Sequence, residues 1–200
     1  MRRAALFALA LCACADDPGR YEAETVIALA QSRGDALGNR HTGDWNMMFT
    51  STECTCDALE TTDGRVIPLC LDPSLLGYVG VQTTEADGRL RLFANVDAMP
   101  DPDPLAMLVQ PLFGSFDLLG SIDADGTIAL GEVNSSTTVI GGARLIVRAD
   151  GTITDFVTGF GSSSAELEAD VSAFLHVEAA DFRYDCRADY EVVGQLQPGF

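Results

Sequence analysis

Cysteine is the residue type in this 200-residue chain with the clearest capacity for chemistry, because a thiol can form a disulfide, ligate a metal or carry a lipid. Six are present: Cys12, Cys14, Cys54, Cys56, Cys70 and Cys186. Cys54 and Cys56 are two residues apart in an expected strand, so both point to the same face and suit separate partners better than each other. We expect one local disulfide to Cys70 and one long-range disulfide to Cys186, which would tie the first strand to the last.

A metal site is the alternative use of these thiols, with His41 or His176 as an additional ligand. Cys-x-Cys with two scattered partners lacks the paired ligand spacing of structural zinc sites. An oxidising compartment also favours disulfides over free thiols. We therefore assign neither a metal nor a cofactor to this chain.

The stretch SIDADGTIALGE, Ser121 to Glu132, matches several positions of an EF-hand calcium loop. Asp123 and Asp125 fall at ligand positions, Gly126 at the turn and Glu132 at the final ligand position, but a serine stands where the first aspartate belongs. The flanking segments are typical of strands, whereas an EF-hand needs two helices. We interpret this stretch as a hairpin turn.

Catalytic residues are not identifiable from the residue pattern. Of the two histidines, His41 falls in an expected linker and His176 lies between Leu175 and Val177 in an expected strand, so a structural role is favoured for both. Neither a Gly-x-Ser-x-Gly elbow nor a glycine-rich phosphate loop before a helix is present in the sequence. No catalytic residue is assigned.

The loop from Asp97 to Gly114, DAMPDPDPLAMLVQPLFG, combines a stiff proline-rich half with an apolar half. We predict that the apolar half packs over one end of the fold as a plug; a lid beside a ligand entrance is the alternative. The candidates for lining such an entrance are Leu105, Met107, Leu108 and Phe113.

Strands must position these residues. FRYDCRADYEV near the end of the chain alternates apolar and polar residues, which indicates a strand with one buried face. Asp-Gly at Asp63, Asp87, Asp125 and Asp150 precedes alternating or β-branched runs and predicts hairpin turns. About ten strands follow: 44–55, 65–71, 76–84, 88–96, 112–123, 126–134, 137–148, 151–159, 168–178 and 182–195.

The predicted fold class is mainly β, an antiparallel meander closed into a barrel or a two-layer sandwich, with a short helix over 22–33 before it. SAELEADV, residues 164–171, also suits a helix, and Gly141 and Gly142 suggest a bulge or bend.

The composition limits the classes of partner that this protein can bind. Thirty acidic residues face twelve arginines and no lysine, for a formal net charge of −18, and such a surface repels nucleic acid. Forty-seven per cent hydrophobic residues are enough for one domain with a core.

Arg2 and Arg3 precede an apolar run from Ala4 to Ala15 of about twelve residues, which is shorter than the roughly 20 residues of a membrane span. Its end, Leu11-Cys12-Ala13-Cys14, resembles the lipobox of bacterial lipoproteins. That resemblance implies cleavage after Ala13, lipidation of Cys14 and, because Ala15 follows, passage to the outer membrane. A register ending at Cys12, or a conventional signal peptide cut near Ala13 or Ala15, is the alternative.

The expected organisation is a signal peptide at 1–13, a lipidated tether at 14–43 and one β domain at 44–200. TGDWNMMF supplies Gly43 and Trp45, and this Gly-x-Trp resembles the first strand of lipocalin-like barrels, including the avidin type. The competing interpretation is that Trp45, the only tryptophan, plugs one end of a β core.

These observations predict a non-enzymatic lipoprotein of the bacterial cell envelope that binds a small apolar ligand or a protein partner. An envelope hydrolase with a dispersed active site is the alternative. Membrane contact is expected through the lipid anchor alone.

Overall fold

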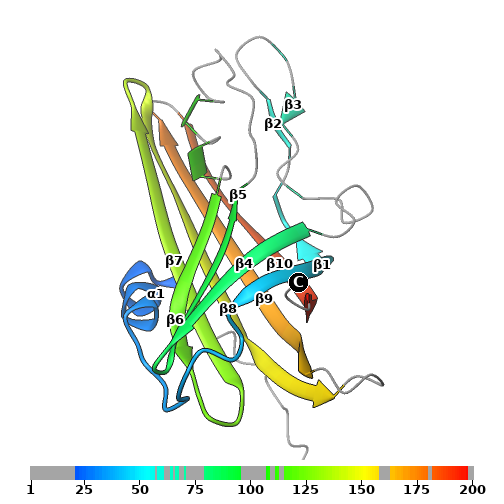
Figure 1. The fold of residues 1–200 in the computed structure, drawn as a ribbon. Coiled ribbons are helices and arrows are strands. Elements are labelled where there is room, and N and C mark those ends of the chain that lie inside the picture. Colours follow the sequence, from blue (N-terminus) through cyan, green and yellow to red (C-terminus); the bar gives the residue numbers. More distant parts are fainter. Residues whose placement is uncertain are drawn as a thin grey trace, which may run out of the picture.

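A closed antiparallel barrel of eight strands forms the body of the protein in a computed structural model (Figure 1). The structure describes residues 21–56, 58–60, 64, 66–67, 70, 79–95, 107–108, 111–112, 115–157, 163–179 and 182–197. The barrel strands are β1 (Gly43–Cys54), β4 (Val79–Ala86), β5 (Arg89–Asn95), β6 (Ser115–Ile122), β7 (Thr127–Thr138), β8 (Gly141–Val157), β9 (Ser163–Ala179) and β10 (Phe182–Leu196). The helix α1 (Ala23–Ala30) and a two-stranded sheet of β2 (Leu59–Glu60) and β3 (Val66–Ile67) complete the elements.

The strand order is β1-β10-β9-β8-β7-β6-β5-β4, and pairing of β1 with β4 closes the ring. Each strand from β4 to β9 pairs with the next along the chain. The first strand lies beside the last, from Trp45 opposite Leu196 to Cys54 opposite Ala188. The predicted mainly β meander with a short preceding helix is therefore confirmed.

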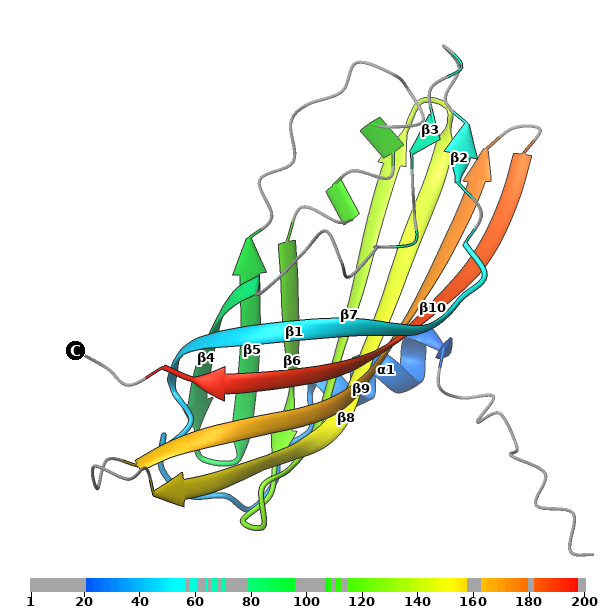
Figure 2. The same cartoon turned by 90° about the vertical axis from the view of Figure 1, so that its right-hand side faces the viewer.

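The two ends of the barrel carry different connections (Figures 1 and 2). We call the end with the β7–β8 and β9–β10 hairpins the mouth, and the end with the β4–β5, β6–β7 and β8–β9 connections the base. In Figure 2 the mouth is at the top and the base at the bottom. Strand β8 runs the whole length between them, from Gly141 at the mouth to Val157 at the base.

One predicted turn is wrong. Asp150-Gly151 does not separate two strands but lies inside β8, where Gly151 pairs with Ile128 of β7 and Ala169 of β9. A Cβ at Gly151 would come within 2.2 Å of the Glu168 carbonyl oxygen, so this glycine permits close approach of two strands rather than a reversal. The turn between β7 and β8 falls instead at Val139 and Ile140. Residues 164–171 belong to β9 and are extended.

Two other Asp-Gly pairs do form turns. Asp87 and Gly88 have φ angles of 47° and 77° between β4 and β5, as a hairpin with positive φ at both central residues requires. Gly126, with φ 89°, turns the chain between β6 and β7. Of the pair at Asp63, only Gly64 is among the described residues, and its φ is 81°.

The segment between α1 and β1, residues 31–42, crosses the base of the barrel. Gly34 N–H donates to the Gly88 carbonyl at 2.8 Å, and Ala36 N–H donates to the Ile122 carbonyl at 3.2 Å. Helix α1 lies against the outside of β6 and β7, with Val26 fully buried there. Residues 21–42, within the stretch assigned to the tether by sequence, thus lie against the barrel.

Candidate functional site

The inside of the barrel is the first candidate site. Near the base, the inward-facing side chains are apolar and buried. They include Trp45, Met47, Val81, Leu90, Ile122, Ile128, Leu130, Ile153 and Leu167. Toward the mouth, several inward side chains are only partly buried against the same core. These are Phe49, Val79, Phe116, Val171, Ala173 and Tyr184.

The inward-facing residues of strand β7 change from apolar to polar at Glu132. Glu132 pairs with Val147, which is buried in the core, and therefore lies on the inward-facing register of β7. Its two carboxylate oxygens accept hydrogen bonds from Asn134 Nδ2 at 2.6 Å and from Asp117 N–H at 2.9 Å. Burial raises the pKa of the Glu132 carboxyl above its ordinary value, against the opposing effect of these two hydrogen bonds. Glu132 and Asn134 thus form a polar pair among the mainly apolar residues in the upper part of the lining.

Strands β6 and β7 separate next to Glu132. Their pairing runs from Ile122–Ile128 up to Leu119–Gly131, and closer to the mouth the two strands diverge (Figure 2). The Asp117 N–H that Glu132 accepts lies on β6 beyond the last of these pairs. Glu132 therefore bridges the two strands at the point where the backbone ladder between them stops.

The mouth is covered by part of the apolar loop identified in the sequence. Leu108 and Leu112 are both helical and almost fully buried in the barrel core, whereas Met107 is half exposed. The apolar half of this loop thus packs as the predicted plug at Leu108 and Leu112. Leu105 and Phe113, the other two candidates for a ligand entrance, lie outside the described residues.

The disulfides stand at the same end. Cys54 bonds to Cys70, and Cys56 bonds to Cys186, with sequence separations of 16 and 130. This is the local and long-range arrangement that the sequence favours. The second bridge joins the chain just after β1 to β10, so it holds the mouth edge of the first and last strands together.

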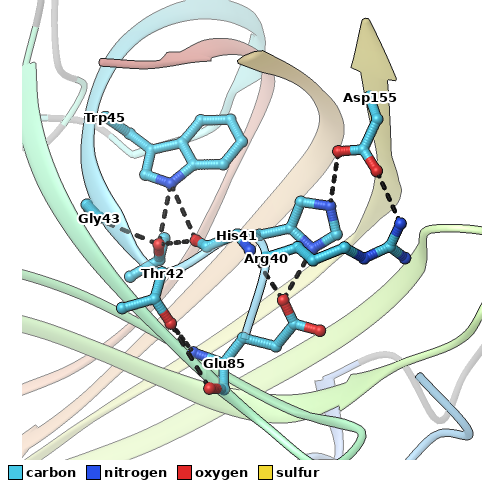
Figure 3. A network of polar contacts seen from close by, with 8 residues as sticks. Arg40, His41, Thr42, Gly43, Trp45, Glu85 and Asp155 are labelled. Atoms are coloured by element: carbon cyan, nitrogen blue, oxygen red, sulfur yellow. Dashed lines mark hydrogen bonds and ion pairs between the residues drawn. The ribbon is translucent and has the colours of Figure 1, made fainter. Parts of the chain in front are cut away.

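The base is closed by a polar network around His41 that the sequence did not reveal (Figure 3). His41 N–H donates to Glu85 Oε2 at 2.8 Å, and its ring Nδ1 lies 2.9 Å from the same oxygen, outside hydrogen-bonding alignment. On the other side, His41 Nε2 lies 3.0 Å from Asp155 Oδ1, and Arg40 pairs with the second oxygen of Asp155 at 3.0 Å. The carboxyl oxygen Glu85 Oε1 is buried without a hydrogen-bond partner among the described residues.

Trp45 joins this network to the core. Its Nε1–H donates to the Thr83 hydroxyl at 2.8 Å and to the His41 carbonyl at 3.3 Å, and the Thr83 hydroxyl donates in turn to the same carbonyl. The indole is fully buried. The tryptophan therefore fills the base of the barrel and fixes the segment that crosses it.

The chemistry open to His41 is limited by its surroundings. Its ring is 3% exposed, and the contacts of the ring in the described part of the chain go to carboxylates rather than to a hydroxyl or thiol. This arrangement suits a structural clamp and not a general base that must reach a substrate.

The second histidine lies on the outer wall. His176 Nδ1 is 2.5 Å from Asp185 Oδ1, and Arg183 pairs with the other oxygen of Asp185 at 3.2 Å. The hydrogen bond from His176 lowers the pKa of Asp185. Within the described residues, we find no group of three or more His, Cys, Asp or Glu side chains arranged for a metal, including the stretch that matches a calcium loop.

A shallow cleft of about 290 Å³ lies on the outer wall where β1, β9 and β10 meet. It is lined by Thr52, Glu53, Asp170, Val171, Ser172, Arg187, Asp189 and Tyr190. Tyr21, the first described residue, lies beside it. The Arg187 guanidinium carbon stands 5.0 Å from the Tyr21 ring centroid, and the Tyr21 ring lies 5.7 Å from that of Phe174.

The protein is therefore a closed antiparallel β-barrel with a mainly apolar lining, a sealed base and a mouth that is partly covered by a loop. Comparison with protein-family models and with curated proteins finds no match. Among the helices that the structure describes, none combines the length and the apolar character needed to cross a membrane.

Proposed function

We propose that this protein is a lipid-anchored binding protein of the bacterial cell envelope, whose barrel holds a small, largely apolar ligand. The observation that carries the proposal is the mainly apolar lining of the barrel, in which Phe49, Phe116 and Ala173 are only partly buried. Binding sites for small molecules are mostly apolar with a few placed polar groups. Glu132 and Asn134 supply such polar groups at mid-height.

The entrance in this proposal lies where β6 and β7 diverge, under the loop that carries Leu108 and Leu112. The base is excluded as an entrance because the His41 network and Trp45 fill it. Movement of the loop would uncover apolar surface and the carboxyl of Glu132 together. The ligand would therefore have an apolar body and one hydrogen-bond donor.

Native mass spectrometry of the purified protein tests for a retained ligand, and a fluorescent apolar probe such as N-phenylnaphthylamine tests the site directly. We expect saturable probe binding that weakens in Ala173→Leu, because Ala173 faces inward and is only partly buried. The matched control is Thr152→Leu, which adds a similar apolar side chain at an exposed position of β8. Circular dichroism checks that both variants keep the fold.

Absence of both a retained ligand and probe binding in the folded wild-type protein would reject a binding role and leave a scaffold role. Equal weakening in Ala173→Leu and Thr152→Leu would place the probe outside the barrel.

The anchor is tested separately. In a bacterial host, Cys14→Ser should lose incorporation of radiolabelled palmitate and leave the membrane fraction, because Cys14 would carry the acyl chains. Cys12→Ser is the control and should keep both properties. Unchanged labelling and fractionation of Cys14→Ser would reject the anchor.

A further inference from the structure

Strand β7 has a free edge in its half nearer the mouth. Its pairing with β6 ends at Gly131 opposite Leu119, whereas β7 itself continues to Thr138 (Figure 2). On its other edge β7 stays paired with β8 as far as Thr138 opposite Gly141. Within the described residues, the stretch from Glu132 to Thr138 is therefore an edge strand of the sheet formed by β7, β8, β9 and β10.

The backbone groups on this free edge belong to alternate residues. The Asp123 N–H donates to the Thr127 carbonyl at 2.9 Å, so Thr127 directs its backbone groups toward β6. Every second residue along a strand does the same, which places the N–H and C=O groups of Val133, Ser135 and Thr137 on the open side. These groups have no hydrogen-bond partner in the described part of the chain, and Ser135 and Thr137 are exposed.

The carboxyl of Glu132 prevents β6 from completing this edge. If the register of β6 and β7 continued beyond Leu119, Asp117 would lie opposite Val133. The Asp117 N–H donates instead to Glu132 Oε2 at 2.9 Å. Because the carboxyl takes this donor, the edge of β7 is left without a strand from its own barrel.

The opposite edge of the same sheet, on β10, is protected in two ways. Beyond the end of its pairing with β1, the Arg187 carbonyl accepts from the Thr55 N–H at 2.8 Å, and the Arg187 N–H donates to the Thr55 hydroxyl at 3.0 Å. Farther along β10, Arg183 and Asp185 form an ion pair at 3.2 Å. Charged side chains are a common means by which edge strands avoid pairing with another chain.

The β7 edge carries no such protection. The sequence has no charged residue between Glu132 and Arg144, a stretch that covers the whole free edge. It also has no proline there, and its valine and threonine residues favour strands. Two copies that each carry a formal net charge of −18 repel one another over most of their surfaces, so they can approach closely only where charge is absent. The β7 edge meets this requirement.

We propose that two copies of this protein associate by antiparallel pairing of their β7 edges about a two-fold axis at Ser136. In this register Ser135 of each copy lies opposite Thr137 of the other, and each supplies the backbone partner that the other lacks. Val139, which is completely exposed in one copy, then lies on the same face as the half-buried Val133 of the other copy and opposite it. The pairing joins the two sheets and goes beyond the ligand binding proposed for the inside of the barrel.

Light scattering coupled to size-exclusion chromatography measures the mass of the full-length protein over a concentration series. The edge variant replaces both Ser135 and Thr137 by lysine, a side chain with which natural edge strands prevent pairing. The matched control replaces both Thr152 and Thr154 by lysine, at exposed positions of β8 that are paired with β9. Each double variant adds two positive charges, so a difference between them reflects position and not net charge. Circular dichroism checks that both keep the fold.

An engineered disulfide locates the two-fold axis. Because Ser136 directs its backbone groups toward β8, the two copies of Ser136 would form a non-hydrogen-bonded pair with Cα atoms about 4.5 Å apart, within the range of a disulfide. Mild oxidation of Ser136→Cys should therefore give a covalent dimer on non-reducing electrophoresis, whereas Thr152→Cys should remain a single chain. Equal crosslinking of the two variants would overturn the proposed pairing.

We expect the wild type and the β8 control to reach twice the mass of one chain as concentration rises, and the edge variant to keep the mass of one chain. Wild-type protein that stays at the mass of one chain throughout, or equal loss of the dimer in both double variants, would overturn the proposal. A smaller added mass that belongs to a foreign peptide and is lost in the edge variant would overturn it as well, by assigning the edge to a strand of another protein.

Discussion

The indole of Trp45 donates a hydrogen bond to the backbone carbonyl of His41, four residues earlier in the chain. The same nitrogen donates to the Thr83 hydroxyl, so one buried side chain links β1, β4 and the segment across the base. Trp45 therefore both fills the core at the base of the barrel and donates hydrogen bonds to two buried acceptors. A substitution there removes both the ring that fills the base and the donor that holds the crossing segment.

Trp45→Phe should destabilise the protein by about 2–4 kcal/mol, because it leaves a cavity and removes the donor from two buried acceptors. Urea unfolding followed by circular dichroism measures the change. The control is Met47→Leu, the next inward residue of β1, which keeps its volume and should cost less than about 1.5 kcal/mol. Equal losses would show that the hydrogen bonds of Trp45 contribute little.

His41→Leu should destabilise the protein by about 1–3 kcal/mol, because the buried Glu85 carboxyl loses the imidazole beside it and keeps only the backbone N–H of residue 41 as a partner. The double variant His41→Leu with Glu85→Leu should recover part of this loss, since no buried charge then remains. Equilibrium unfolding of the wild type, the two single variants His41→Leu and Glu85→Leu, and the double variant measures the coupling. Asp155→Asn should cost no more than about 1 kcal/mol, because the Asp155 side chain is 46% exposed. A double variant less stable than His41→Leu alone would contradict this account.

Local sequence patterns predicted most of the barrel. Strict alternation in β10 and the Asp-Gly turns at Asp87 and Asp125 identified strands and hairpins within a few residues. The failure at Asp150-Gly151 is physical, because glycine serves two purposes: it allows positive φ in a turn, and it lets backbones approach closely in a sheet. Sequence alone does not distinguish these roles. Pairing of Gly151 on both sides decides for the second.

The contacts of the candidate site were harder to predict from the sequence than the strands of the barrel. The disulfide partners could be inferred because two cysteines two residues apart suit separate partners better than each other, although Cys56 lies just after β1 and not on a face shared with Cys54. The base network could not, because Glu85 and Asp155 are 44 and 114 residues from His41 and nothing local marks them as its partners. Glu132 was noticed as the last position of a calcium-like loop, whereas the fold uses it as an inward carboxyl bound to Asn134 and Asp117.

The two disulfides should contribute unequally. In the loop-entropy model, a bridge with a separation of 16 stabilises by about 3 kcal/mol and one with a separation of 130 by about 5 kcal/mol. Cys56→Ser with Cys186→Ser should therefore lower the free energy of unfolding more than Cys54→Ser with Cys70→Ser. Replacing cysteines in bonded pairs prevents exchange between Cys54 and Cys56. The reverse order of stability would indicate that the mouth loop depends on its local bridge.

Gly88→Ala should be more destabilising than Gly38→Ala, although both glycines have positive φ. At Gly88 an added Cβ would lie 2.1 Å from the Gly34 carbonyl oxygen, whereas at Gly38 nothing lies within 4 Å. Gly38→Ala should thus cost about 1 kcal/mol from backbone strain alone, and Gly88→Ala at least about twice that. Thermal unfolding of the two variants measures the difference. Similar losses would show that the segment across the base moves aside without cost.

The pH dependence of stability should have opposite signs at Glu132 and Asp185. Burial raises the pKa of Glu132 in the folded protein, so the folded state binds a proton at this carboxyl more tightly than the unfolded state does. The contribution of Glu132 to stability therefore falls as the pH rises from the unfolded pKa of about 4.3 through the folded pKa. The hydrogen bond from His176 lowers the pKa of Asp185, so its contribution is present above the unfolded value of about 3.9 and is lost as pH falls through the folded pKa.

Urea unfolding across a pH series separates the two effects when the wild type is compared with Glu132→Gln and with Asp185→Asn. The stability of the wild type relative to Glu132→Gln should decrease with rising pH. Relative to Asp185→Asn it should increase, by no more than about 1 kcal/mol because Asp185 is partly exposed. Because each comparison subtracts the charges common to both proteins, a shared sign would mean that Glu132 is solvated rather than enclosed by the barrel. The polar group of the proposed ligand site would then have to be sought elsewhere in the lining.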